Sequence, residues 1–166
     1  MRQTIKMELS EKIKEKNTQI HIIGNLPILK AMHSSMMHHV FQNLIANAIK
    51  FNTNPKPTIN IGCSETNGMF KFTVQDNGIG IDPAYKSKLF QMFKRLHTSE
   101  QYEGTGIGLA VCKKIINFYK GKIWFESEPG NGTIFYFTLP NLEAENQTNI
   151  CREIISPSPS ALLNAA

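Results

Sequence analysis

The chain has 166 residues, of which 41% are hydrophobic and 19% are charged, and its formal net charge is +5. These values are typical of one soluble globular domain with a fair core. No apolar run is long enough to cross a bilayer, and the charged segment Met1–Lys16 lacks the apolar centre of a signal peptide. We therefore expect a cytoplasmic protein without direct membrane insertion.

The cysteines and the basic residues exclude further classes of protein. The three cysteines are widely separated and odd in number, so neither a disulfide framework nor a zinc site is predicted. The lysines are spread along the chain, and no aromatic and basic RNA-binding motif accompanies them. The positive charge therefore favours an anionic ligand rather than a nucleic-acid partner.

The first part of the chain predicts a charged helix followed by a short strand. Over Met1–Asn17, the apolar residues Ile5, Leu9 and Ile13 recur every four positions between lysines and glutamates. This apolar stripe is thin, which is typical of the end of a longer helix. Gln19–Ile23 is predicted as a strand, and a loop with glycine and proline follows it.

The next element is a predicted helix that is capped by Ser34 or Ser35 and runs to about Phe51. One face carries Asn43, Asn47 and Lys50, which lie three to four residues apart. Two amides and an ammonium in this arrangement can hold a hydrated magnesium ion and a polyphosphate, although they also suit a solvated polar face. The opposite, apolar face consists of Met37, Val40, Phe41, Leu44, Ile45, Ala48 and Ile49.

A predicted hairpin leads into a loop rich in glycine. Thr58–Ser64 and Met69–Gln75 are its strands, and the loop Asp76–Ile81 follows with the sequence Asp-Asn-Gly-Ile-Gly-Ile. A carboxylate at a strand end accepts a hydrogen bond from an exocyclic amine, and glycines let the backbone approach a planar ligand. The alternative is an ordinary turn, because Asn-Gly is by itself a strong hairpin signal.

A second stretch rich in glycine follows a short predicted amphipathic helix at Leu89–Leu96. Gly104–Leu109 opens a helix that runs to about Tyr119, and its free N–H groups and positive dipole end suit an anion. Because glycine spacing alone is a weak signal, a flexible hinge is the alternative. Gly121–Ser127 and Thr133–Leu139 are then the clearest predicted strands.

These pieces divide the chain into three parts and converge on one ligand. Residues 1–17 are predicted to end a preceding helix or linker, 18–140 to form the domain, and 141–166 to be a loose tail. The polar helix face, the strand-end carboxylate and the glycine-led helix together offer cation, base and phosphate recognition. That combination suits a magnesium nucleotide, and an ionised Asp76, which only accepts hydrogen bonds, favours adenine. Guanine also carries an amine, so the preference is not strict.

The order and wording of these motifs resemble the ATP-binding catalytic domain of bacterial sensor histidine kinases, which belongs to a superfamily shared with gyrase, the Hsp90 chaperone and MutL. The sequence of Leu89–Leu96 is similar to the corresponding motif of phytochrome-like and hybrid kinases. The resemblance spans roughly Gln19–Pro140. It rests on an N box, a first glycine box, an F box, a second glycine box and a final hairpin: His39–Phe51, Asp76–Ile81, Leu89–Leu96, Gly104–Leu109 and Gly130–Pro140.

The resemblance implies ATP and Mg²⁺ as cofactors and assigns roles to individual residues. Asn47 is implied to coordinate magnesium with Asn43 beside it, while Lys50 reaches phosphate and Phe51 flanks the base. Asp76 is implied to accept from the adenine amine. Arg95 meets the terminal phosphates, so Asn43, Lys50 and Arg95 are the implied catalytic residues. The remaining implied contacts to the nucleotide are Gly78, Gly80, Ile81, Gly104, Thr105, Gly106, Gly108, Leu109 and Thr133.

The implied fold is an α+β, two-layer α/β sandwich of the Bergerat ATP-binding type. It has a mixed sheet of about five strands, three helices on one face, and a nucleotide lid between Asp82 and Glu103. The apolar faces of the two main predicted helices are expected to pack on the sheet. The nucleotide is then expected to lie between the helices and the lid.

The implied activity is transfer of the ATP γ-phosphate to a histidine on a separate dimerisation domain, with a response regulator served indirectly. No histidine in this sequence has the following acidic residue and proline of such an acceptor, so autonomous transfer is not expected. The parent kinase can be membrane-anchored on this interpretation. Two alternatives keep the fold: a stand-alone serine kinase of the anti-sigma-factor type, and a nucleotide-gated binding module without transfer activity.

Overall fold

The computed structural model describes residues 9–29, 32–85, 87–93 and 105–141. Within these ranges no helix is both long and apolar enough to span a membrane. In chain order, the elements are α2 (Ser10–Glu15), β1 (Gln19–Ile23), α3 (Ser34–Lys50), β2 (Thr58–Thr66), β3 (Met69–Asp76), η1 (Pro83–Tyr85), α4 (Gly108–Phe118), β4 (Ile123–Ser127) and β5 (Thr133–Pro140).

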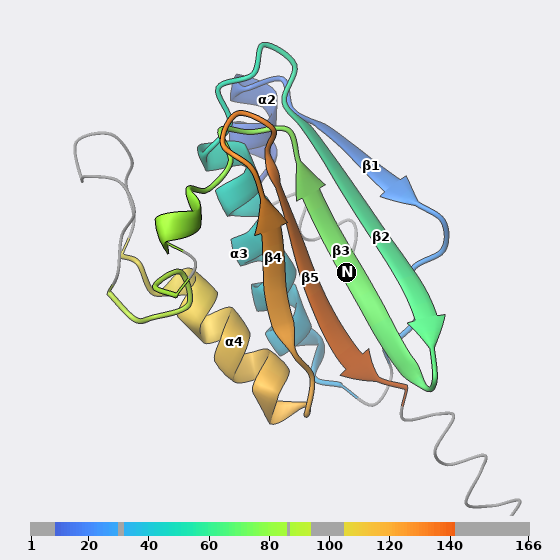
Figure 1. Ribbon diagram of the computed structural model, residues 1–166. Coiled ribbons are helices and arrows are strands. Elements are labelled where there is room, and N and C mark those ends of the chain that lie inside the picture. Colours follow the sequence, from blue (N-terminus) through green and yellow to red (C-terminus); the bar gives the residue numbers. More distant parts are fainter. Residues whose placement is uncertain (1–8, 30–31, 86, 94–104, 142–166) are drawn as a thin grey trace, which may run out of the picture.

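The five strands form one mixed sheet in the order β1-β2-β3-β5-β4. β1 runs parallel to β2, and the other neighbours are antiparallel. The helices α3 and α4 pack against each other and lie on the same side of the sheet (Figure 1). The predicted two-layer α+β architecture is therefore confirmed.

The core lies between the sheet and the apolar face predicted for α3, all seven residues of which are buried. Phe72 of β3 stacks on Phe137 of β5 with ring centroids 4.8 Å apart, and Phe41 of α3 meets both rings edge-on. Because side chains alternate along a strand, the same inward face of β3 and β5 continues to Asp76 and Thr133. These two residues are paired across the strands, and both are buried. The core pattern thus delivers a carboxyl and a hydroxyl to one end of the sandwich.

Two local predictions are wrong. The helix α3 begins after His33, whose extended backbone takes the cap position without a side-chain cap hydrogen bond, so neither Ser34 nor Ser35 caps it. The predicted helix over Leu89–Leu96 is not found in its described part, because residues 87–93 form turns. Phe93 there has a left-handed backbone with φ of 61°, which cannot continue an α-helix. The rest of that segment, residues 94–96, lies outside the described residues.

Candidate functional site

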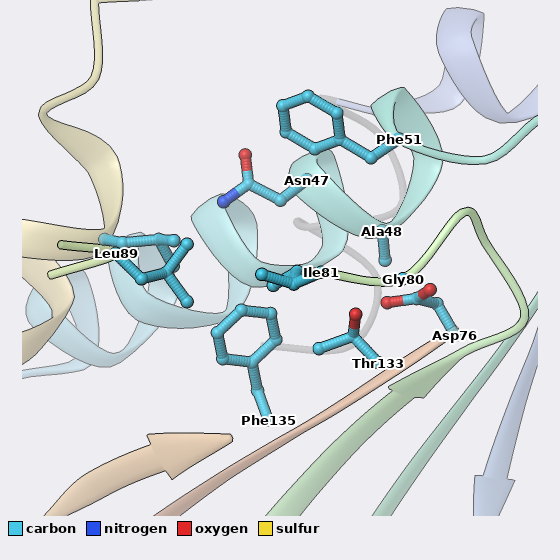
Figure 2. Close-up of a pocket in the computed structure, with 10 residues that line it drawn as sticks. Asn47, Ala48, Phe51, Asp76, Gly80, Ile81, Leu89, Thr133 and Phe135 are labelled. Atoms are coloured by element: carbon cyan, nitrogen blue, oxygen red, sulfur yellow. The ribbon is translucent and has the colours of Figure 1, made fainter. Parts of the chain in front are cut away.

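A cavity opens between α3 and the end of the sheet where Asp76 and Thr133 lie. Together with its open mouth, it holds about 440 Å³ of empty space. Figure 2 shows Asn47 and Phe51 on the α3 side and Asp76 and Thr133 on the strand side. The lining residues are Asn47, Ala48, Phe51, Asp76, Gly80, Ile81, Leu89, Leu109, Thr133 and Phe135.

The Asp76 carboxyl is the acidic group in this lining, and its side chain is only 9% exposed. Burial raises its pKa to about 6, although hydrogen bonds from the backbone N–H groups of Gly78 and Thr133 lower it. The Gly78 N–H donates to Asp76 Oδ1 over 2.8 Å. The carboxyl is therefore held in place by the backbone, and it is poorly hydrated, so a ligand donor that reaches it gains a strong acceptor.

The glycines of the Asp76–Ile81 loop allow close backbone packing around the cavity. A Cβ on Gly78 would collide with the carbonyl oxygen of Phe51, and the neighbouring Ile79 N–H donates to that same oxygen over 3.0 Å. Gly80 has a left-handed φ of 72°, and a Cβ there would collide with the Glu128 carbonyl. The loop is thus fixed between the end of α3 and the β4–β5 turn.

Ser127, the last residue of β4, ties this loop to the β4–β5 turn. Its Oγ accepts from the Ile81 N–H over 2.8 Å and donates to the Gly132 carbonyl over 2.7 Å. It also lies 2.9 Å from the hydroxyl of Thr133. The two lining residues Ile81 and Thr133 are therefore held through one serine that is not itself part of the lining.

On the helix side, α3 presents Asn47 and Phe51 to the cavity one turn apart. The Lys50 ammonium lies 4.4 Å from the centre of the Phe51 ring. Asn43, one turn before Asn47, donates its amide to the His39 carbonyl over 2.8 Å, and its oxygen lies against the backbone of Gly108. Asn43 thus joins α3 to the start of α4, while Asn47 faces the cavity.

The profile of the histidine kinase-, DNA gyrase B- and HSP90-like ATPase family matches residues 32–143. This chain belongs to that family. The matched range includes the whole cavity lining, so the cavity is part of an ATP-binding catalytic domain of the histidine-kinase kind.

Relatives and solved structures agree with this assignment. The chain is 48% identical over 132 residues to the phytochrome-like protein Cph1 of Synechocystis sp., covering 80% of this chain and 17% of the relative. It is 51% identical over 115 residues to cyanobacterial phytochrome A of Nostoc sp., covering 69% of this chain and 15% of the relative. The chain thus spans less than a fifth of either relative's length. The catalytic domain of the histidine kinase ThkA superposes with a TM-score of 0.67 at 28% identity, covering 84% of this chain and 89% of that domain.

The ATPase domain brings together about half of the residues that the motifs singled out. Those that line the one cavity are Asn47, Phe51, Asp76, Gly80, Ile81, Leu109 and Thr133. Gly78 donates its backbone N–H to the Asp76 carboxyl. The residues that lie outside the lining are Asn43, Lys50, Thr105, Gly106 and Gly108. Arg95 and Gly104 are outside the described residues.

Sequence reasoning missed several residues of the site. Leu89 and Phe135 line the cavity. The only sequence signals for this were the apolar character of both residues and, for Phe135, the alternation along its strand. Asn77 resembles the first residue of an Asn-Gly turn, but its side chain connects Asn52 to the start of β2. Its oxygen accepts from Asn52 over 2.9 Å and from the Thr58 N–H over 2.8 Å. The sequence around Ser127 gave no indication of its role, because a serine before a turn is common.

Proposed function

We propose that this domain binds Mg-ATP in the cavity and serves as the catalytic part of a two-component histidine kinase. The observation that carries the proposal is that Asp76 of β3 and Asn47 of α3 line the same cavity. The acceptor for a base and the amide for a metal-bound phosphate tail come from two layers of the fold, so the nucleotide lies between them. We call the surroundings of Asp76, Gly78, Gly80 and Thr133 the base end of the site.

At the base end, the adenine amine donates to the Asp76 carboxylate. The backbone of Gly80 and the side chains of Ile81 and Leu109 give the flat ring apolar contact. Phe51 covers the ring from the α3 side. The carboxylate is acceptor-only when ionised, which favours a base with an amine at this edge.

The opposite part of the site, which we call the phosphate end, comprises Asn43, Asn47, Lys50 and the chain at Gly106–Gly108. Among the described residues, no three His, Cys, Asp or Glu side chains lie together as a metal site. The Asn47 amide oxygen is a hard ligand of the kind that magnesium prefers, so Asn47 would hold the ion here. When bound, magnesium neutralises phosphate charge.

Asn47 orients the phosphates, and the Lys50 ammonium, now 4.4 Å from the Phe51 ring, moves to meet them. Asn43 supports the start of α4, whose N–H groups face phosphate oxygens. Arg95, Gly104 and Thr105 complete this end in the proposal. Asn43, Lys50 and Arg95 are its catalytic residues, because they position and neutralise the transferred group.

The phosphoacceptor is a histidine on a dimerisation domain outside this chain. Solved relatives support this arrangement: ThkA has been solved in complex with the response regulator TrrA, and full-length ShkA with AMPPNP. We propose that residues 1–17 continue from that dimerisation domain, that 18–140 form the catalytic domain, and that 141–166 form a tail. A domain that uses ATP in this way belongs in the cytoplasm.

The test mixes this chain with radiolabelled Mg-ATP and a purified dimerisation domain from a phytochrome-like kinase. We expect label on the acceptor that is lost in acid and survives alkali, because phosphohistidine is acid-labile. Acid-stable label would indicate a serine kinase. A chain that binds Mg-ATP but labels no acceptor domain would contradict the transfer activity and favour a binding module. Asp76→Asn, which replaces the charged base acceptor with a weaker, uncharged one, is the control for specific labelling.

A further inference from the structure

The Ser127 hydroxyl takes part in three contacts that together determine where its hydrogen points. It donates to the Gly132 carbonyl, which has no proton to give, over 2.7 Å. It accepts from the Ile81 N–H over 2.8 Å, so one of its lone pairs is used. A hydroxyl has one hydrogen and two lone pairs, so its only remaining capacity is to accept once more.

The direction of the Thr133 hydroxyl follows from this balance. Its Oγ1 lies 2.9 Å from Ser127 Oγ, and a hydrogen bond between them requires Thr133 to be the donor. Its hydrogen is then directed at Ser127, away from the ligand, while its oxygen lone pairs remain available on the cavity side. Thr133 is 95% buried, so bulk water does not replace this hydrogen bond.

The consequence is a base end with hydrogen-bond acceptors from both side chains. Asp76 already accepts from the backbone N–H groups of Gly78 and Thr133, and when ionised it can also accept from a ligand. Thr133 beside it also accepts. A purine with a 6-amino group gives a proton to this edge, whereas a 6-oxo group places a third acceptor against two others, which is costly in a buried site.

We propose that Ser127 is a positioning residue that sets the base preference of the site by holding the Thr133 hydroxyl as an acceptor. The inference rests on the proposed nucleotide site and adds the residue that makes it selective for 6-aminopurines. Ser127 touches no ligand itself. Its effect on the base preference is exerted through the Thr133 hydroxyl, while its bond to the Ile81 N–H holds the glycine loop.

The test compares ADP with inosine diphosphate by calorimetry in the presence of magnesium. Inosine diphosphate carries a 6-oxo group and a protonated N1 where ADP has a 6-amino group and an unprotonated N1. Wild type is expected to prefer ADP strongly. In Ser127→Ala the Thr133 hydroxyl is free to turn and donate to the 6-oxo group, so the preference for ADP falls about tenfold, as expected for one hydrogen bond. If the alanine variant does not fold, Ser127→Cys takes its place, because a thiol is close in size to the hydroxyl and forms only weak hydrogen bonds. It is expected to lower the preference for ADP as well.

A double-mutant cycle separates this role from a purely structural one. In a Thr133→Val background, Ser127→Ala is expected to leave the preference unchanged, because no hydroxyl remains to be turned. If Ser127→Ala weakens both nucleotides equally, so that the preference stays the same, the inference is overturned while the nucleotide site stands. If wild type binds neither nucleotide, the proposed function fails and the inference with it.

Discussion

The base end and the phosphate end of the site differ in how far the fold prepares them. At the base end, the two polar side chains have partners from the fold: Asp76 accepts from the Gly78 and Thr133 backbones, and the Thr133 hydroxyl bonds to Ser127. At the phosphate end, Asn43 donates within its own helix and Lys50 lies over the Phe51 ring. One end is a rigid receptor, and the other contains groups that must exchange their contacts when phosphates arrive.

This difference follows from where each end lies in the fold. The base end grows from paired strands, whose register fixes Asp76 opposite Thr133. The phosphate end lies on the polar surface of α3 and on the chain that leads into α4, where long side chains keep rotamer freedom. In the proposed function, base selectivity therefore belongs to the folded core, whereas phosphate and metal binding involve rearrangement of side chains.

The largest expected effect comes from crowding the rigid end. Gly80→Ala places a Cβ against the Glu128 carbonyl at a left-handed φ, so we expect the free energy of unfolding to fall by about 3 kcal/mol or more. Gly130→Ala is the matched control, since its φ is 84° but its Cβ meets open space. It is expected to cost only about 1–2 kcal/mol. Equal losses in urea denaturation would show that the loop at Gly80 is not packed as described.

The buried carboxyl predicts a pH-dependent stability difference. The pKa of Asp76 is raised to about 6 in the folded protein from an ordinary value of 3.8. Its neutral form therefore favours folding at low pH, and this contribution is lost as the pH rises from about 4 through 6. Asp76→Asn has no such loss, so its stability relative to wild type is expected to rise by roughly 2 kcal/mol between pH 4 and pH 7.

Urea denaturation of both proteins across this pH range measures the difference, in which the other titrating groups cancel. A constant difference between wild type and Asp76→Asn would mean that Asp76 is hydrated and ordinary.

A smaller effect is expected at the phosphate end. Asn47→Ala removes the amide that we propose to meet magnesium, so ADP binding should lose most of the affinity that magnesium adds, about tenfold. Binding without magnesium should change much less, which makes the metal-free titration an internal control. An equal loss under both conditions would place Asn47 against the base rather than against the metal.

The smallest expected effect concerns the anchoring of α3. The Lys16 ammonium, just after α2, donates to the carbonyls of Ile49, Lys50 and Asn52 at distances of 3.0, 3.3 and 3.2 Å. It thereby satisfies the C-terminal end of α3, where a cation is favoured. Lys16→Met is expected to cost about 1 kcal/mol of stability. Lys14→Met, at an exposed position in α2, is the control, and an equal effect in thermal melts would count against the anchor.

The sequence predicted the features that arise from periodicity. The alternation of apolar and polar residues along β3 and β5 predicted the ends of these strands to within one or two residues. The spacing of apolar residues by three or four positions along α3 predicted its buried face. Asp76 and Asn47 were predictable because a strand end and a helix face have regular geometry. That these two residues serve one nucleotide was a hypothesis from the combined motifs, and the family resemblance strengthened it.

Features that depend on three segments meeting were not predictable. The Ser127 hydroxyl joins the glycine loop to a turn, and the Asn77 amide bridges Asn52 and the start of β2. Nothing in the local sequence distinguishes these residues from ordinary turn formers. The apolar pattern at Leu89–Leu96 suggested a helix, but Leu89 turns into the cavity, and Phe93 is 70% exposed with a left-handed backbone.

Calorimetric titration of ADP with magnesium into wild type and Asp76→Asn at pH 7.5 tests most directly whether the carboxylate on β3 receives the base. The amide side chain retains the shape of the carboxyl but offers the amine a weaker, uncharged acceptor. We expect the variant to remain folded and its affinity to fall at least a hundredfold, as for the loss of a charged, buried hydrogen bond. A folded variant that binds ADP as tightly as wild type would contradict the account.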